Sequence, residues 1–125
     1  LCDRRQRQMC IRDRYLIVVP ESGGMYLAPL DDGVRAVARQ IIGARHVDTA
    51  PCIPDTRFTV LFSEWTTVDR YNHVAAVLAS EPIMGPCVIA HGDRSDALHG
   101  MTRGAADRAM RHLMALAAEG GDDRV

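Results

Sequence analysis

The chain has 125 residues, of which 47% are hydrophobic and 25% are charged, and its formal net charge at pH 7 is −1. This length and composition are typical of one globular domain and argue against a disordered chain. No apolar run approaches the roughly 20 residues that a membrane-spanning helix requires. The basic opening also lacks the apolar stretch of a secretory signal, so we expect a cytoplasmic domain with no membrane segment.

The first 14 residues differ from the rest of the chain. Arg4–Arg14 holds five arginines and two glutamines without a hydrophobic period, so it predicts neither a strand nor an amphipathic helix. A basic arm for nucleic acid and a solvated tail are two interpretations. The third is that residues 4–13, RRQRQMCIRD, resemble the translated transposase adapter used to prepare sequencing libraries. We therefore set 1–14 aside and expect one domain over 15–120 with a frayed tail at 121–125.

Without this segment the charge and the cysteine content change. Ten arginines then face fourteen carboxylates, and this acidic balance argues against a nucleic-acid partner. Cys52 and Cys87 remain, and two cysteines without a signal peptide favour reduced, buried thiols. The chain has no lysine and a single asparagine, Asn72, which indicates a GC-rich coding source.

The domain is expected to begin with a β-hairpin. Tyr15–Pro20 is a continuous apolar run rich in β-branched side chains, which predicts a buried strand. Gly23 and Gly24 can adopt positive φ in the turn that follows, so Met25–Leu30 should pair antiparallel with the first strand. Pro29 places this second strand at an edge of the sheet or at its own terminus.

A helix is expected directly after the hairpin. Asp31 or Asp32 can act as its N-cap, because a carboxylate accepts free amide hydrogens of the first turn. Gly43 is the expected stop. The apolar residues recur at helical spacing and form one stripe: Val34, Val37, Ala38, Ile41 and Ile42.

Three further strands are expected. Arg45–Ile53 alternates loosely between polar and apolar residues, and Arg57–Trp65 is rich in aromatic and β-branched residues. Ile83–Gly92 is the third expected strand, and its apolar run Cys87–Ala90 predicts that it is buried there.

Two helices complete the pattern. Asn72 can cap a short helix over His73–Ser80, which the Glu-Pro pair at 81–82 should end. Thr102 can cap a longer helix over Arg103–Glu119. One face of that helix is apolar: Ala106, Ala109, Met110, Leu113, Leu116 and Ala117. The expected fold class is α+β, with a small mixed or antiparallel sheet of about five strands, two main helices and one short helix.

Five short motifs, taken in order, are similar to a family of short phage-, plasmid- and actinobacterial-type proteins classed as a domain of unknown function. They are LIVVPESGG, VARQIIGARHV, Glu64 in VLFSEW, Asn72 followed by Ala75–Ala76, and IMGPCVIAHG with Gly85. The resemblance covers roughly Leu16 to Asp93. The glycine that usually follows the acidic residue is replaced here by Trp65. The resemblance implies a small α+β domain from a phage or other mobile element, with no established activity.

The densest polar cluster lies in the loop HGDRSDALHG and comprises His91, Asp93, Asp96 and His99. Imidazoles and carboxylates in so short a segment could converge on a zinc or manganese ion, and an open coordination position could activate water. The spacing matches no zinc-protease or zinc-finger pattern. The flanking Gly92 and Gly100 equally suit a solvated loop.

A second polar cluster lies between an expected strand and the short helix: Glu64, Trp65, Asp69, Arg70, Tyr71 and Asn72. Loops on a rigid scaffold often host binding residues, and the two aromatic side chains would suit recognition of a protein partner. The alternative is structural, with Asn72 as a helix cap and Arg70 in a surface ion pair.

Other chemistry has less support. Cys87 sits in an apolar run where burial makes a thiol inert, and Arg103, Arg108 and Arg111 with His112 lie among acidic neighbours in an acidic domain. No nucleotide-binding or serine-hydrolase motif is present. We therefore expect a non-enzymatic accessory domain that binds a protein partner and needs no cofactor. The alternative is a metal-dependent hydrolase that uses zinc or manganese in the loop from His91 to His99.

Overall fold

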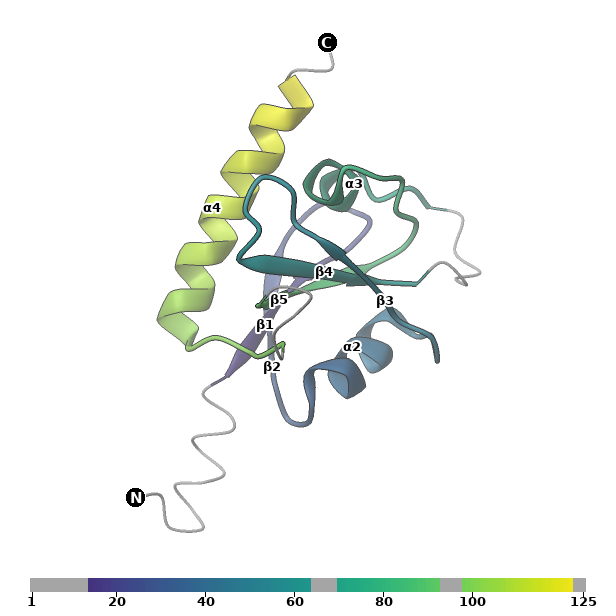
Figure 1. Cartoon of the computed structure of the whole chain (residues 1–125), viewed down its shortest axis with the longest axis vertical. Coiled ribbons are helices and arrows are strands. Elements are labelled where there is room, and N and C mark those ends of the chain that lie inside the picture. The colour runs from purple at the N-terminus through teal and green to yellow at the C-terminus, as the bar shows by residue number, and fades with distance from the viewer. Residues whose placement is uncertain (1–13, 64–69, 93–97, 123–125) are drawn as a thin grey trace.

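A computed structural model of the protein describes residues 14–63, 70–92 and 98–122. Within these ranges the elements follow the predicted order (Figure 1): β1 Tyr15–Val19, β2 Tyr26–Pro29, α2 Val34–Ile42, β3 Asp48–Pro51, β4 Phe58–Phe62, α3 His73–Ala79, β5 Cys87–His91 and α4 Arg103–Asp122. The predicted α+β class is confirmed. None of the helices in the described ranges combines the length and apolarity that crossing a membrane would need.

The five strands form one sheet in the order β2-β1-β5-β4-β3. All four neighbouring pairs are antiparallel, so the sheet is antiparallel rather than mixed. The hairpin of β1 and β2 is confirmed. Pro29 and Pro51 lie in the edge strands β2 and β3, where a missing amide hydrogen does not interrupt the interior ladder.

The centre of the sheet is β5, which pairs with β1 on one side and with β4 on the other. Its residues Cys87, Val88, Ile89 and Ala90 are each 0% exposed, as the apolar run predicts. Because successive side chains of a strand point to opposite faces, Cys87 and Ile89 join one core cluster while Val88 and Ala90 join the other.

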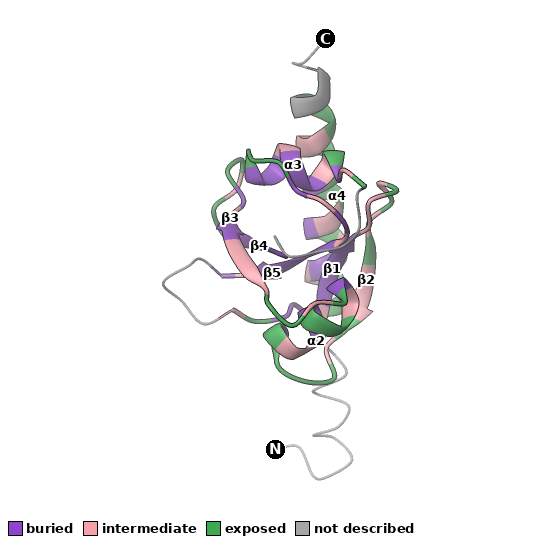
Figure 2. Cartoon of the chain, turned by 90° about the vertical axis from the view of Figure 1, so that its right-hand side faces the viewer, coloured by how far each residue is buried: buried purple, intermediate pink, exposed green. Residues whose placement is uncertain are grey.

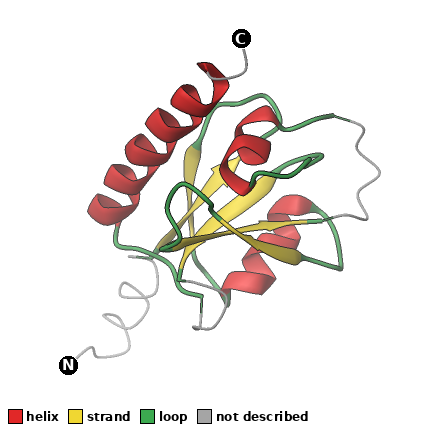
Figure 3. Cartoon of the chain, turned by 45° about the horizontal axis from the view of Figure 1, so that its top comes forward, coloured by secondary structure: helices red, strands yellow, loops and turns green. Residues whose placement is uncertain are grey.

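Helices cover both faces of the sheet (Figures 1 and 3). The apolar stripe of α2 packs on one face, against side chains such as Leu16 and Leu61. On the opposite face α3 and α4 pack against each other and against the sheet, with Leu78 and Leu113 fully buried. Figure 2 shows the resulting burial, with the central strands buried and the outer helix surfaces exposed.

The start of α2 corrects one prediction. Its N-cap is Gly33, which makes no side-chain capping bond, and neither Asp31 nor Asp32 caps the helix. The Asp32 carboxylate instead accepts a hydrogen bond of 2.7 Å from the Gly33 amide, one residue too early to reach the first turn. The end of α2 is as predicted, because Gly43 adopts φ 76° and donates its amide to the Arg39 carbonyl.

Several element ends also differ from the prediction. The strands β3 and β5 are shorter than Arg45–Ile53 and Ile83–Gly92. Gly85 has φ 77°, a conformation that does not continue a strand. α3 ends because Ser80 turns left-handed, before the Glu-Pro pair is reached. α4 runs to Asp122, beyond the predicted end, and its Thr102 cap is confirmed by a 3.3 Å bond from the Ala105 amide.

Asn72 joins three parts of the fold through one buried side chain. It is 0% exposed, and its Oδ1 accepts a hydrogen bond of 3.1 Å from the Ala75 amide, which caps α3 as predicted. Its Nδ2 donates to the Val19 carbonyl at the end of β1 and to the Gly85 carbonyl before β5, both at 2.9 Å. The amide therefore fixes the starts of α3 and β5 relative to β1.

We expect Asn72→Ala to lower the free energy of unfolding by about 3 kcal/mol, because it removes a helix cap and the side-chain donor of two buried carbonyls. Asn72→Asp keeps the cap oxygen but places a carboxylate against the same two carbonyls, so it should also destabilise the chain. Urea unfolding measures both variants against Gln40→Ala, an exposed change in α2. A loss for Asn72→Ala no larger than that of Gln40→Ala would contradict this role.

Candidate functional site

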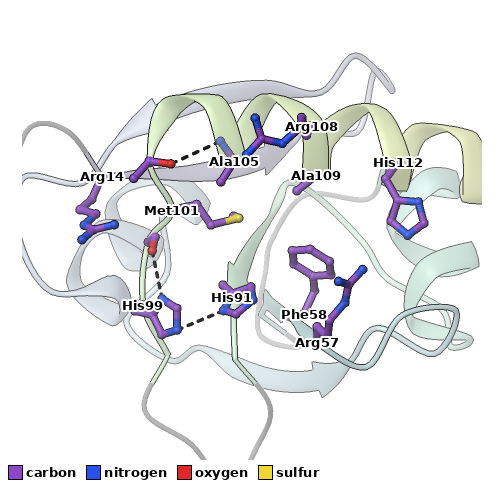
Figure 4. A pocket seen from close by; sticks show the side chains of 12 residues that line it. Arg14, Arg57, Phe58, His91, His99, Met101, Ala105, Arg108, Ala109 and His112 are labelled. Atoms are coloured by element: carbon purple, nitrogen blue, oxygen red, sulfur yellow. Dashed lines mark hydrogen bonds between the residues drawn. The ribbon is translucent and has the colours of Figure 1, made fainter.

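A pocket of about 490 Å³ lies between α4 and the adjoining ends of β4 and β5. Figure 4 shows α4 along one side, with Ala105 and Arg108 above Met101, and with His91 and Phe58 across from them. Phe58 is the first residue of β4 and His91 the last residue of β5, and the two are register partners. Their rings meet edge to face with centroids 5.6 Å apart.

Apart from Thr102, the polar side chains that line the pocket are guanidinium or imidazole groups: Arg14, Arg57, Arg108, His91, His99 and His112. The rest of the lining is largely apolar, and among the described residues it includes no aspartate or glutamate. Arg14 lies in the segment 1–14 that we set aside, and residues after it supply Arg57 and Arg108. Arg108 makes no ion pair with any described residue. Arg57 and His112 are both paired with Asp55, so Arg108 is the unpaired cation that the domain brings to the pocket.

His91 and His99 are brought together by the backbone. Each donates its amide to the other's carbonyl, at 3.1 and 3.0 Å, so the two residues form an antiparallel bridge at the end of β5. Their imidazoles also meet, with Nδ1 of His91 3.1 Å from Nε2 of His99. Nδ1 of His99 lies 3.0 Å from the Gly100 carbonyl oxygen. Both nitrogens of His99 are therefore engaged within the chain.

The pKa of His91 is lowered from its usual value. Burial is the main cause, and the positive charges of His99 and Arg57 add to it, while Asp55 acts weakly in the opposite direction. Burial and neighbouring cations both disfavour the imidazolium form. Both effects therefore favour the neutral imidazole form of His91.

One carboxylate ties the turn before β4 to α4. Asp55 accepts hydrogen bonds from Arg57, at 2.9 and 2.6 Å, and it lies 3.0 Å from Nε2 of His112 on α4. The Asp55 side chain is 10% exposed and that of Arg57 is 69% exposed. The hydrogen bonds from Arg57 hold the pKa of Asp55 well below its usual range, against an opposing effect of burial.

The structure describes only part of the predicted metal set. His91 and His99 lie in contact, whereas Asp93 and Asp96 fall outside the described residues. Within the described ranges no three histidine, cysteine, aspartate or glutamate side chains are grouped so as to hold a metal ion. Metal binding at this loop stays a prediction.

Half of the predicted protein-binding set, Glu64, Trp65 and Asp69, also lies outside the described residues. Arg70 is exposed and Tyr71 is half-buried against the His73 ring. Asn72 is fully buried and engaged within the chain, so its side chain is structural and offers no contact surface. The protein-partner hypothesis also stays a prediction.

The two cysteines of the domain are buried and free, as expected. Burial raises the pKa of the Cys52 thiol to about 11 and raises that of Cys87 further. Both thiols are therefore protonated at neutral pH, and neither lines the pocket.

Sequence patterns alone gave little support for Arg108 and His112 as functional-site residues. They did not single out Arg57. Arg108 and His112 lie four residues apart and so share one side of a helix, which is the only local signal of a common site. Their meeting with Arg57 and His91 depends on β4 pairing with β5 and on α4 lying across that edge. Comparison with family models, curated proteins and solved structures gives no match, so the family resemblance stays a prediction.

The lowered pKa of Asp55 predicts a specific loss of stability in acid. A carboxyl group with a depressed folded pKa stabilises the protein above its unfolded pKa of about 3.9, and this contribution is lost as the pH falls through the lower folded value. We therefore expect Asp55→Asn to be less stable than the parent chain at pH 7, with a difference that shrinks below about pH 4. Urea unfolding across this pH range measures it.

The matched control is Asp31→Asn, because Asp31 is exposed and makes no side-chain bond with any described residue. Its difference from the parent chain should stay small at every pH. If the Asp55→Asn difference does not depend on pH, Asp55 is not the source of the acid sensitivity.

Proposed function

We propose that the chain is a ligand-binding domain whose pocket takes a small molecule bearing a phosphate, sulfate or carboxylate group. The observation that supports this most is the guanidinium of Arg108, which lines the pocket without an ion pair to any described residue. Arg57 and His112 line the pocket beside it and are paired with Asp55. Guanidinium groups bind such oxyanions through charge-assisted hydrogen bonds.

The apolar part of the lining indicates a ligand that is more than a bare ion. Phe58, Met101, Ala105 and Ala109 offer hydrophobic surface beside the cationic groups. A volume of about 490 Å³ is within the range of small-molecule sites. An anionic group attached to a compact apolar body fits both parts of the pocket.

Binding of an anion would also act on His91. The positive charges of Arg57 and His99 help to lower the pKa of this imidazole, and a bound anion would offset them. The same anion would therefore be held more tightly when His91 is protonated, because binding and protonation are linked.

The metal-dependent hydrolase is the second proposal, supported by the contact between the His91 and His99 rings. A metal ion would have to replace this hydrogen bond, because each ligating nitrogen needs a free lone pair. The contact therefore supports the pocket as a site more directly than it supports a metal centre. A zinc or manganese scan of the melting temperature tests this proposal, since bound metal stabilises the folded state.

For the anion proposal we expect sulfate at a few millimolar to raise the melting temperature of the full chain, because a ligand of the folded state stabilises it. Arg108→Gln should reduce this rise, since it removes a cation from the pocket without breaking an ion pair among the described residues. Differential scanning fluorimetry at constant ionic strength measures the response. The low concentration keeps the general stabilising effect of sulfate small.

Two variants control for the change in net charge and for a contribution from residues 1–14. Arg35→Gln makes the same charge change on the exposed side of α2 and should leave the sulfate response intact. A response that persists in Arg14→Gln belongs to the domain itself. If Arg108→Gln and Arg35→Gln respond to sulfate equally, the pocket is not the anion site.

A further inference from the structure

The hydrogen bonds at the bridge determine where the protons lie. A carbonyl oxygen can only accept, so the contact with Gly100 requires a proton on Nδ1 of His99. When His99 is neutral, its Nε2 is then an acceptor, and the 3.1 Å contact requires a proton on Nδ1 of His91. A neutral His91 with that tautomer carries its lone pair on Nε2.

The Nε2 atom of His91 is the ring nitrogen left without a hydrogen-bond partner among the described residues. His91 lines the pocket beside Phe58, and Figure 4 shows its ring on the side of the pocket that faces α4. The contact of its Nδ1 with His99 fixes the orientation of the His91 ring. Burial and the charge of Arg57 lower the pKa of His91 even when His99 is neutral, and a neutral imidazole nitrogen is a nucleophile.

We propose that His91 is a phosphoryl-accepting residue. Its Nε2 attacks the phosphorus of an acyl phosphate bound in the cationic pocket. This inference rests on the proposed function. Arg108 lines this pocket without an ion pair to any described residue, and Arg57 lines it with its Nε and one terminal nitrogen bound to Asp55. Such groups stabilise the charge on the phosphoryl oxygens during transfer. His99 acts as a positioning residue that holds the tautomer and orientation of the nucleophile.

The transfer step balances without a further reactant. The lone pair of Nε2 forms the N–P bond while the P–O bond to the acyl group breaks, and its electron pair leaves on the carboxylate product. The ring of His91 becomes an imidazolium, and its Nδ1–H stays hydrogen-bonded to Nε2 of His99. Loss of one proton to water then gives the neutral phosphorylated imidazole.

The lining of the pocket also favours one class of compound as the donor of the phosphoryl group. The described lining has no carboxyl group that could act as an acid toward a departing alkoxide. Of the other histidines there, His99 has both ring nitrogens engaged within the chain and Nε2 of His112 lies against Asp55. A carboxylate leaving group departs as a stable anion and needs no proton. Acyl phosphates therefore fit this pocket better than simple alkyl phosphate esters.

The test incubates the full chain with acetyl phosphate and measures the intact mass, the acid lability of the product and the ³¹P spectrum. We expect one added phosphoryl group with the acid lability and chemical shift of an N–P bond. Peptide mapping of the parent chain should place it on His91. His91→Gln should lose it, while His46→Gln, a change at an exposed histidine outside the pocket, should keep it.

The sulfate melting response separates this inference from the proposed function. No transfer in a chain that sulfate stabilises would overturn the phosphoryl-accepting role and leave anion binding in place. A phosphoryl group mapped to any other residue would overturn it as well. Failure of both the sulfate response and the transfer would overturn both proposals. Peptide mapping on the parent chain distinguishes these outcomes even if His91→Gln does not fold.

Discussion

The fold depends on one buried amide. Asn72 accepts from the first turn of α3 and donates to carbonyls at the end of β1 and before β5, all without exposed surface. A buried amide is stable only when its donors and acceptors are satisfied together. This requirement selects one arrangement of the three segments. It also fixes where β5 enters the centre of the sheet.

The pocket lies at the other end of the same strand. β5 ends at His91, which pairs with Phe58 of β4 and forms the bridge with His99. On the opposite side, Asp55 connects the turn before β4 to His112 of α4. The His91 imidazole, the Arg57 guanidinium and the apolar surface are thus held by regular elements and by short contacts, which is the arrangement that binding sites require.

Local signals in the sequence predicted the elements well, and nonlocal contacts explain what they missed. The apolar stripe of α2, the Asn72 cap and the buried run of β5 each depend on neighbours in the chain. The end of α3 was missed because Ser80 adopts φ 55°, which its residue type does not favour. The pocket was missed because Asp55 and His112 are 57 residues apart and meet only when the sheet order is known. The contact of His91 with His99 could be expected from the sequence, because the two residues flank one short loop. The pairing of His91 with Phe58 could not, because it depends on the sheet order.

The most direct test of the anion pocket is an NMR titration of the His91 imidazole in the full chain, with and without sulfate, whose charge is constant between pH 5 and 8. We expect a lowered pKa without sulfate and a clear rise on its addition, since a bound anion offsets the repulsion from His99 and Arg57. The exposed His46 serves as the internal control. A pKa of His91 that sulfate shifts no more than that of His46 would contradict anion binding in this pocket.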